Sequence, residues 1–201
     1  MNKQSLIYTV IFTFLVSFVF VTVLAFANDS TREQVQLNQE LARQRAILNA
    51  LNIDYDGPDD VQAKFDDVEI EDRDGTELYK AQKDDHTAIA KEFSGSGLWG
   101  TIRGILAVQE DLSRTVGIEI IEHNETPGLG GRIDEPWFKE QLRNLRIVDG
   151  TIDVGGAGDG DEDKENGEID AITGATRTSD AMRVILSKEL STFESVLGGN
   201  S

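Results

Sequence analysis

At residues 170–176 the sequence reads Asp-Ala-Ile-Thr-Gly-Ala-Thr, and an amphipathic helical pattern follows closely. The stretch is a hydroxyl-rich turn with a small-residue centre. It predicts that Thr176 lies at or near a helix N-terminus, where backbone N–H groups and the helix dipole favour a phosphate. Considered alone, these residues also fit an ordinary helix cap, so the rest of the chain has to distinguish the two interpretations.

The segments around this turn predict the fold class. Downstream, apolar residues follow a helical stripe that ends at Gly198-Gly199. Upstream, short apolar segments separated by glycine-rich turns are typical of antiparallel strands. Strands are expected at 68–70, 78–79, 105–108, 116–121 and 145–148, and short helices at 61–65 and 137–145. The sequence therefore predicts an α+β fold, in which helices pack on an antiparallel sheet.

The segment 153–170 is strongly acidic, with eight acids, one lysine and five glycines. This composition predicts an exposed, mobile loop. The spacing of Asp159, Asp161 and Asp163 partly matches an EF-hand calcium loop, but Lys164 stands where that loop needs glycine and its twelfth residue is not Glu. This segment therefore allows one function without redox chemistry: that of a membrane-anchored module whose acidic loop binds calcium or a cationic partner.

Residues 6–27 contain no charged side chain and are almost all apolar. A helix of this length measures about 33 Å, enough to cross a bilayer core of about 30 Å. Ala25-Phe26-Ala27 also resembles a signal-peptidase site, but the apolar region is longer than that of a usual cleaved signal. We expect residues 1–28 to be a retained transmembrane anchor. Lys3 precedes the span, so the positive-inside preference places the C-terminal part outside the cytoplasmic membrane, on the periplasmic side.

Residues 29–60 are expected to form a connecting helix and a linker. Asp29, Ser30 and Thr31 offer N-cap residues, and leucines then recur at helical spacing as far as Asn52. An interaction helix for a partner subunit is the alternative interpretation of this segment. Residues 61–201 are then the extracytoplasmic domain, which is long enough for a hydrophobic core.

The chain of 201 residues contains no cysteine and two histidines. Without thiols, disulfides, thiolate metal sites and cysteine-ligated iron–sulfur clusters are excluded, and two histidines are too few for a histidine-rich metal site. Redox chemistry must therefore use a bound organic cofactor or a metal held by oxygen and nitrogen ligands. The net charge of −18 argues against a nucleic-acid partner, because such a surface repels phosphate backbones.

Three separated segments together resemble one family. They are Gly-Leu-Trp-Gly-Thr-Ile at 97–102, Glu-Thr-Pro-Gly-Leu-Gly at 125–130, and the stretch at 170–176. With the single N-terminal span, they resemble the C subunits of sodium-translocating NADH:quinone oxidoreductases. The G subunits of ferredoxin:NAD oxidoreductase complexes share the second and third segments. In this covalent FMN-binding family the motif is Asp, two variable residues, Ser or Thr, Gly, Ala, and a final Thr or Ser that carries the flavin.

The resemblance implies a membrane-anchored electron-transfer subunit with FMN joined to Thr176 by a phosphodiester bond. It implies a relay within an NADH:quinone oxidoreductase rather than an independent catalyst, so no catalytic residue is assigned. The implied partners are the other membrane subunits of the complex and a flavin transferase that uses FAD and magnesium. The equivalent subunit of a ferredoxin-linked complex is the close alternative.

The phosphate end of the cofactor is expected around the 170–176 stretch. Thr173 and Thr178 can donate hydrogen bonds to phosphate oxygens, and the helix N-terminus complements the negative charge. Gly174 and Ala175 leave the backbone uncovered, so that a large flavin donor can approach. Asp170 is expected to serve in recognition by the transferase or in shaping the turn.

The isoalloxazine end needs an apolar wall. Our candidates for it are Leu98, Trp99 and the Thr126–Leu129 loop, which includes Gly128. Thr126 or backbone N–H groups are expected to bond ring heteroatoms. Two alternatives stay open: Trp99 can be an ordinary core residue, and His123 beside the loop is assigned a structural role in preference to that of a proton donor.

Overall fold

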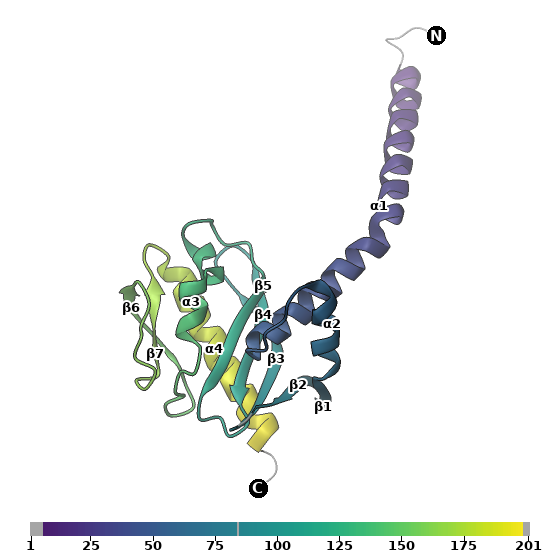
Figure 1. Cartoon of the computed structure of the whole chain (residues 1–201). Helices are drawn as coiled ribbons and strands as arrows, with labels where there is room; N and C mark the ends of the chain where they lie inside the picture. The colour runs from purple at the N-terminus through teal and green to yellow at the C-terminus, as the bar shows by residue number, and fades with distance from the viewer. Residues whose placement is uncertain (1–5, 84, 199–201) are drawn as a thin grey trace. The chain divides into compact units, whose positions relative to one another are not determined.

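The computed structural model describes residues 6–83 and 85–198, and these residues form two compact units, divided between Glu40 and Leu41 (Figure 1). The first unit consists of most of α1 (Leu6–Ala50). The second holds five strands, which form one sheet in the order in which they follow along the chain. Their bounds are β1 Glu69–Arg73, β2 Thr76–Gln82, β3 Thr87–Ser96, β4 Thr101–Gln109 and β5 Thr115–Glu122. All neighbouring strands are antiparallel, which confirms the predicted α+β class.

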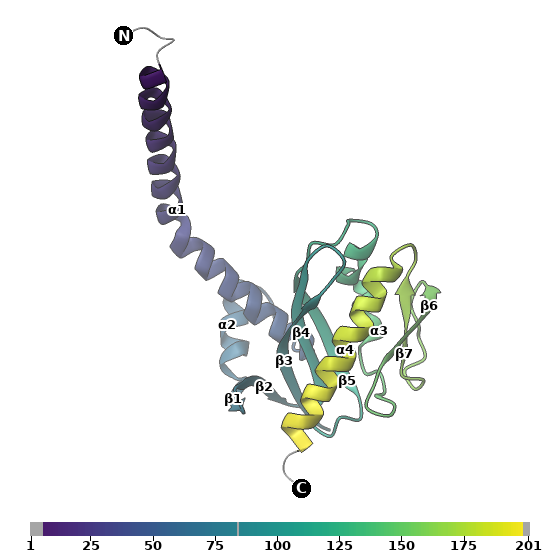
Figure 2. The ribbon, with the colours of Figure 1, turned by 180° about the vertical axis from the view of Figure 1, so that it is seen from behind.

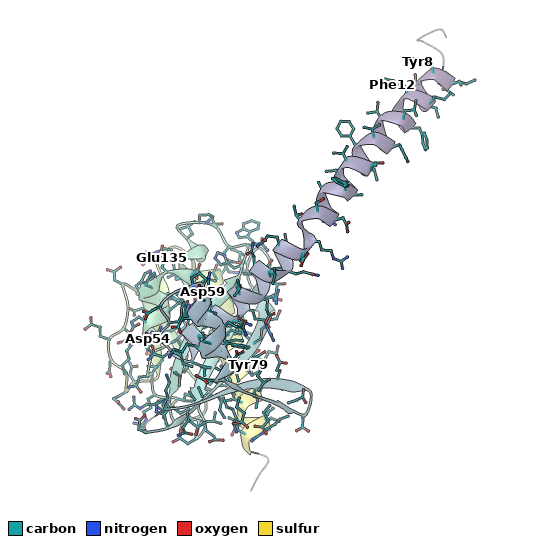
Figure 3. The ribbon with its side chains drawn as sticks, turned by 45° about the vertical axis from the view of Figure 1, so that its right-hand side comes forward. Tyr8, Phe12, Asp54, Asp59, Tyr79 and Glu135 are labelled. Carbon is teal, nitrogen blue, oxygen red and sulfur yellow. The ribbon has the colours of Figure 1, made fainter. Side chains whose placement is uncertain are left out.

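The first unit presents apolar side chains on all sides of α1. Its large apolar residues between Leu6 and Phe26 are exposed, and the stacked rings of Tyr8 and Phe12 lie with centroids 6.0 Å apart (Figure 3). By length and composition, α1 can cross a membrane, and it is the one helix in the described part of the chain with this property. A helix that is apolar all round is typical of a membrane span.

The predicted helix start at Asp29-Ser30-Thr31 is wrong, because α1 runs through these residues without a break. The Ser30 hydroxyl donates to the Phe26 carbonyl at 2.9 Å, and the Thr31 hydroxyl donates to the Ala27 carbonyl at 3.1 Å. Hydroxyl side chains can bond the carbonyl four residues back inside a helix as well as cap one. The sequence pattern alone does not distinguish these two uses.

The sheet lies between two layers, and side chains alternate between its faces. In β4, Leu106 and Val108 join the core beneath α4 (Thr176–Leu197), whereas Ile105 and Ala107 join a second core. That second core also contains residues 46–51 at the end of α1 and Val61 of α2 (Pro58–Asp66). Figure 2 shows α4 crossing the opposite face of the sheet. Both faces are therefore covered, as expected for a sheet in a layered domain.

Strands β1, β2, β4 and β5 confirm the strands expected near 70, 79, 105–108 and 116–121, but β3 was not predicted. This strand pairs with both β2 and β4. Ala88, Ile89 and Ala90 are all fully buried, because the residues facing either layer are covered. A strand buried on both faces lacks the alternation of apolar and polar residues by which strands are recognised.

The predicted strand at 145–148 is wrong. This segment forms only two isolated bridges, Arg114 with Arg146 and Val148 with Thr151. The preceding helix, α3 (Pro136–Gln141), also ends earlier than expected. Asn144 and Asp149 have φ of 53° and 51°, and such left-handed residues interrupt an extended chain on both sides.

The acidic segment is not simply a loop. Its ends form two parallel strands, β6 (Asp153–Gly158) and β7 (Glu168–Ile172). Val154 and Ile169 are fully buried in the core beneath α4, and this burial anchors both strands. The few apolar residues of the segment therefore decide its structure, and its acids lie mostly in the connection at 159–167.

Candidate functional site

Thr176 is the first residue of α4, and its side chain is exposed. The helix was expected to start close to Thr178, so the start lies two residues earlier and includes Thr176 in its first turn. Within the described residues, no side-chain hydrogen bond caps this N-terminus. The first backbone N–H groups of a helix have no acceptor inside the helix and favour an anion. Thr176, the residue predicted to carry the flavin, thus lies where a phosphate would be stabilised.

The turn before Thr176 is held to α4 by Ser179. The Ser179 hydroxyl accepts the Ile172 N–H at 3.0 Å and donates to the Ala175 carbonyl at 3.1 Å. Gly174 has a φ of +79°, which a residue with a side chain rarely adopts. Thr173 is exposed on this turn, next to Gly174. These contacts hold the hydroxyl-rich turn in one conformation without covering it.

Glu125, the first residue of the second matched segment, joins the first segment to the start of α4, directly after the third segment. This residue is only 4% exposed. Its Oε1 accepts the Leu98 N–H at 2.8 Å and the Trp99 N–H at 3.0 Å, while its Oε2 accepts the Thr178 hydroxyl at 2.5 Å. Residues 26 to 53 positions apart in the chain are thereby brought to one carboxylate. We expected Thr178 to donate to a phosphate, but in this structure its hydroxyl donates to Glu125.

Apolar side chains lie exposed on the loops that Glu125 gathers. Leu98, Trp99 and Leu129 are 44%, 67% and 45% exposed. Trp99 is therefore not a core residue, and that alternative is wrong. Leu129 lies against the attachment turn, because its side chain comes within 3.3 Å of where a Cβ on Gly174 would stand. An apolar wall of this kind can cover an aromatic ring system.

The Thr126–Leu129 loop is fixed by its own backbone. The Thr126 carbonyl accepts the Leu129 N–H at 3.1 Å and the Gly131 N–H at 2.9 Å, just before η1 (Gly130–Asp134). Thr126 and Gly128 are exposed, and Gly128 has a φ of +74°. His123 Nδ1 accepts the Glu125 N–H at 3.1 Å, which supports the structural role expected for His123. The proposed bonds from this loop to ring heteroatoms stay predictions.

Asp170 lies in β7, and its carboxylate accepts the Gly160 N–H at 3.0 Å. This contact is made to the connection between β6 and β7, so the roles expected for Asp170 in the 170–176 turn and in transferase recognition stay predictions. In the same connection, Asp161 accepts hydrogen bonds from the Asn166 side chain and the Asp163 N–H, and these bonds lower the pKa of Asp161. The described residues contain no cluster of three or more His, Cys, Asp or Glu side chains that could hold a metal ion.

Glu125 and Ser179 are the two residues of the site that the sequence did not assign. Glu125 begins the second matched segment, but nothing in Glu-Thr-Pro-Gly shows that its carboxylate points inward. Ser179 stands among several hydroxyl residues at a helix start and is equally unmarked. Both act through partners in distant segments or in the backbone, which a linear pattern does not display.

Comparison with known proteins agrees with this geometry. Residues 97–190, which include all the contacts of Glu125 described above, match the FMN-binding domain family. The C subunit of the Na(+)-translocating NADH-quinone reductase from Neisseria meningitidis is 38% identical over 111 residues, or 52% of this chain and 42% of that protein. The G subunit of the ion-translocating oxidoreductase complex from Methanosarcina acetivorans is 34% identical over 86 residues, or 43% and 40% of the two chains. The matched region thus spans about two fifths of the length of these relatives.

Solved structures share the fold. The C subunit of the Na(+)-translocating NADH-quinone reductase from Parabacteroides distasonis matches with a TM-score of 0.68 and 21% identity, over 84% of this chain and 98% of that one. NqrC from Shewanella oneidensis matches with a TM-score of 0.67 and 18% identity, over 78% and 96%. The resemblance drawn from the three segments is confirmed: residues 97–190 match the FMN-binding domain family, and C and G subunits of ion-translocating oxidoreductases are similar to this chain.

Proposed function

We propose that this chain is a membrane-anchored electron-transfer subunit that carries FMN on Thr176 within a sodium-translocating NADH:quinone oxidoreductase. One observation carries the proposal. The turn at 97–100 and the first turn of α4 converge on Glu125, and the Thr176 hydroxyl stays exposed at the start of α4, beside an exposed apolar wall. The similarity to C subunits over half of the chain supports the assignment to this complex.

The residues present fit both ends of FMN. At the phosphate end, the uncapped first turn of α4 offers backbone N–H groups, and the exposed Thr173 hydroxyl lies on the adjoining turn. At the ring end, Leu98, Trp99 and Leu129 offer apolar surface that is otherwise exposed to water. When bound, FMN supplies the reversible uptake of electrons, and the protein supplies position and electrostatic tuning.

Attachment requires that a separate transferase reach Thr176. In the reaction we propose, the Thr176 Oγ1 forms a bond to the phosphorus of the FMN half of FAD. The bond from that phosphorus to the bridging oxygen breaks, AMP leaves, and the hydroxyl proton passes to a base of the transferase. The exposure of Thr176, together with the small residues Gly174 and Ala175 before it, leaves room for this approach. Asp170 is retained as a proposed recognition residue for the transferase.

The attachment experiment uses the full chain co-expressed with a flavin transferase and separated on a denaturing gel under illumination. We expect a fluorescent band for the wild type and for Thr176→Ser, which keeps a hydroxyl, and none for Thr176→Ala. Thr192→Ala, at the other end of α4, is the matched control and should fluoresce. Intact mass should show the addition of one FMN. A dark wild-type band, with the transferase active on another substrate, would refute the proposal.

We further propose that the N-terminal part of α1 anchors the domain to the cytoplasmic membrane, with residues 41–201 on the periplasmic side. The absence of cysteine provides a direct test. A single cysteine introduced at the exposed Ser191 should react with a membrane-impermeant maleimide in intact cells whose outer membrane has been made permeable. Labelling only after lysis of the inner membrane would place the domain in the cytoplasm and overturn this orientation.

The second candidate function is the same electron-transfer role in a related complex. The similarity to the G subunit from Methanosarcina acetivorans favours an equivalent role in a ferredoxin-linked, ion-translocating complex. Both functions use the same FMN site and differ in the partner subunits. Purification of the complex in detergent, followed by identification of its subunits and of its electron donor, distinguishes them: NADH with a quinone acceptor supports the first, and reduced ferredoxin with NAD supports the second.

A further inference from the structure

Resting on the proposed attachment of FMN at Thr176, we propose that Glu125 is the positioning residue of the flavin site. Its carboxylate joins the turn at 97–100, which carries Leu98 and Trp99 of the ring wall, to the start of α4, which carries the attachment hydroxyl. The distance between the ring wall and the phosphate site is then set by one buried side chain. The place of Glu125 in the second matched segment does not by itself indicate this role, and neither does its exposure, because the residue is buried.

Both carboxylate oxygens of Glu125 are occupied by groups from different segments. The turn at 97–100 joins β3 to β4, and the Gly97 N–H donates across it to the Gly100 carbonyl at 2.7 Å. The next two N–H groups, of Leu98 and Trp99, donate to Glu125. Backbone N–H groups that are buried or half-buried need an acceptor. Removal of the Glu125 carboxylate should therefore destabilise the conformation of this turn.

The backbone approaches the Glu125 carboxylate closely at two glycines. A Cβ on Gly97 would stand 2.5 Å from Glu125 Oε1, and a Cβ on Gly130 would stand 2.8 Å from Glu125 Oε2 and overlap the Thr178 hydroxyl. Glycine at these two positions therefore allows the backbone to lie against the carboxylate and its donors.

The third residue of the ring wall is fixed from the same point. The Glu125 N–H donates to His123 Nδ1, and the residue that follows, Thr126, accepts the Leu129 N–H through its carbonyl. Leu129 in turn lies against the attachment turn at Gly174. The ring wall and the turn at 173–176 thus both depend on contacts of the 123–129 segment, and within it Glu125 bonds both the 97–100 turn and α4.

Two substitutions separate the role of the Glu125 hydrogen bonds from that of its negative charge. In Glu125→Gln, the remaining carbonyl oxygen can accept the Leu98 and Trp99 N–H groups, and the amide can donate to the Thr178 oxygen. In Glu125→Ala, all three donors lose their acceptor. A positioning role therefore predicts that Gln preserves the arrangement of the site and Ala does not, whereas a role of the negative charge predicts that both variants are defective.

The first arm of the experiment needs no flavin. In the full chain with Trp137→Phe, Trp99 is the one remaining tryptophan, so its fluorescence anisotropy reports the 97–100 turn. We expect lower anisotropy in Glu125→Ala and wild-type anisotropy in Glu125→Gln. Phe193→Leu, a core variant at the far end of α4, controls for general loss of stability and should leave the anisotropy unchanged. Unchanged anisotropy in Glu125→Ala, or a loss in Glu125→Gln equal to that in Ala, would overturn the proposal.

The second arm uses the flavinylated chain. Ring exposure is measured by iodide quenching of flavin fluorescence and by the visible circular dichroism of the flavin. Glu125→Ala should approach the quenching constant of free FMN and lose the dichroic band, while Glu125→Gln should resemble the wild type. Wild-type values in Glu125→Ala would overturn the positioning role. A wild type that carries no flavin refutes the proposed function instead, and the anisotropy arm still decides the role of Glu125 in the 97–100 turn.

Discussion

The two ends of α4 are held to the rest of the domain in different ways. At its N-terminal end, Thr178 donates to Glu125, and the neighbouring Thr176 stays exposed. At its C-terminal end, Glu189 forms an ion pair with Lys91 of β3, and both side chains are less than a tenth exposed. The Lys91 ammonium also lies 5.7 Å from the centre of the buried Phe193 ring. The C-terminal end of α4 therefore stabilises the fold, whereas the N-terminal end combines a contact with Glu125 and an accessible candidate site.

This difference has an energetic meaning. A buried ion pair contributes little beyond what an apolar pair would, but removal of one partner is costly because the other charge remains buried. The site end contains a single hydroxyl–carboxylate hydrogen bond and leaves three apolar side chains in water. Accessible apolar surface is an unfavourable arrangement for the isolated domain, and its retention is typical of a binding surface. Substitutions along α4 should consequently separate stability from flavin attachment.

The largest effect on stability is expected at the C-terminal end. Lys91→Met should lower the free energy of unfolding by about 3–5 kcal/mol, because it leaves the buried Glu189 with only the largely exposed Lys188 ammonium, 3.6 Å away, as a cation. Urea unfolding of the full chain in detergent, followed by circular dichroism, measures the change. The double variant Lys91→Met/Glu189→Leu should recover most of the loss. A change below about 1 kcal/mol in the single variant would contradict the structural role of this end.

A smaller effect is expected at Thr178, which is 1% exposed. Thr178→Val keeps the shape of the side chain and removes the donor to Glu125, so unfolding should become easier by about 1.5–3 kcal/mol, the usual range for a hydrogen bond to a charged group. Thr178→Ser retains the hydroxyl and should recover most of the difference. The same urea titration checks both variants, and equal stability of Val and Ser would show that the hydrogen bond contributes nothing.

Ser179 should have a still smaller effect, although it is 3% exposed. Ser179→Ala removes an acceptor from the Ile172 N–H, and the loss should be about 1 kcal/mol, the mean value for a neutral hydrogen bond. Flavin attachment should slow at the same time, because the turn before Thr176 loses its contact with α4. Ser191→Ala, at an exposed position of the same helix, is the control. A variant that attaches flavin at the wild-type rate would assign Ser179 to the fold alone.

The same two ends show what the sequence can predict. The helical stripe predicted α4, and its contact with the sheet followed from the apolar face. Strand β3, which carries Lys91, was missed because Lys91 and Glu92 follow a run of three buried residues, and this order resembles neither a helix nor an alternating strand. The partner of Lys91 is 98 residues away, so the ion pair that explains a charged residue inside a central strand is invisible in the linear pattern.

The residues of the candidate site also fall into two groups, those that a local motif reveals and those that it does not. Thr176, Leu98 and Leu129 were proposed as site residues from short local motifs, because the chemistry of each can be inferred from its own segment. Glu125 was quoted only as the first letter of a motif, because its three partners lie 26 to 53 residues away. Candidate residues for contact with a ligand can therefore be proposed from motifs, whereas the residues that hold those motifs together require the fold.

The smallest effect on stability is expected at the residue with the largest effect on function. Thr176→Ala changes an exposed side chain that caps nothing among the described residues, so the free energy of unfolding should stay within about 0.5 kcal/mol of the wild type. Measured by the same urea titration on unflavinylated protein, this near-neutral result should accompany complete loss of covalent flavin. Lys91→Met should show the reverse, with flavin still attached to the folded fraction. If Thr176→Ala instead destabilised the domain as much as Thr178→Val, the N-terminal end of α4 would be a structural contact like the C-terminal end, and the contrast between them would disappear.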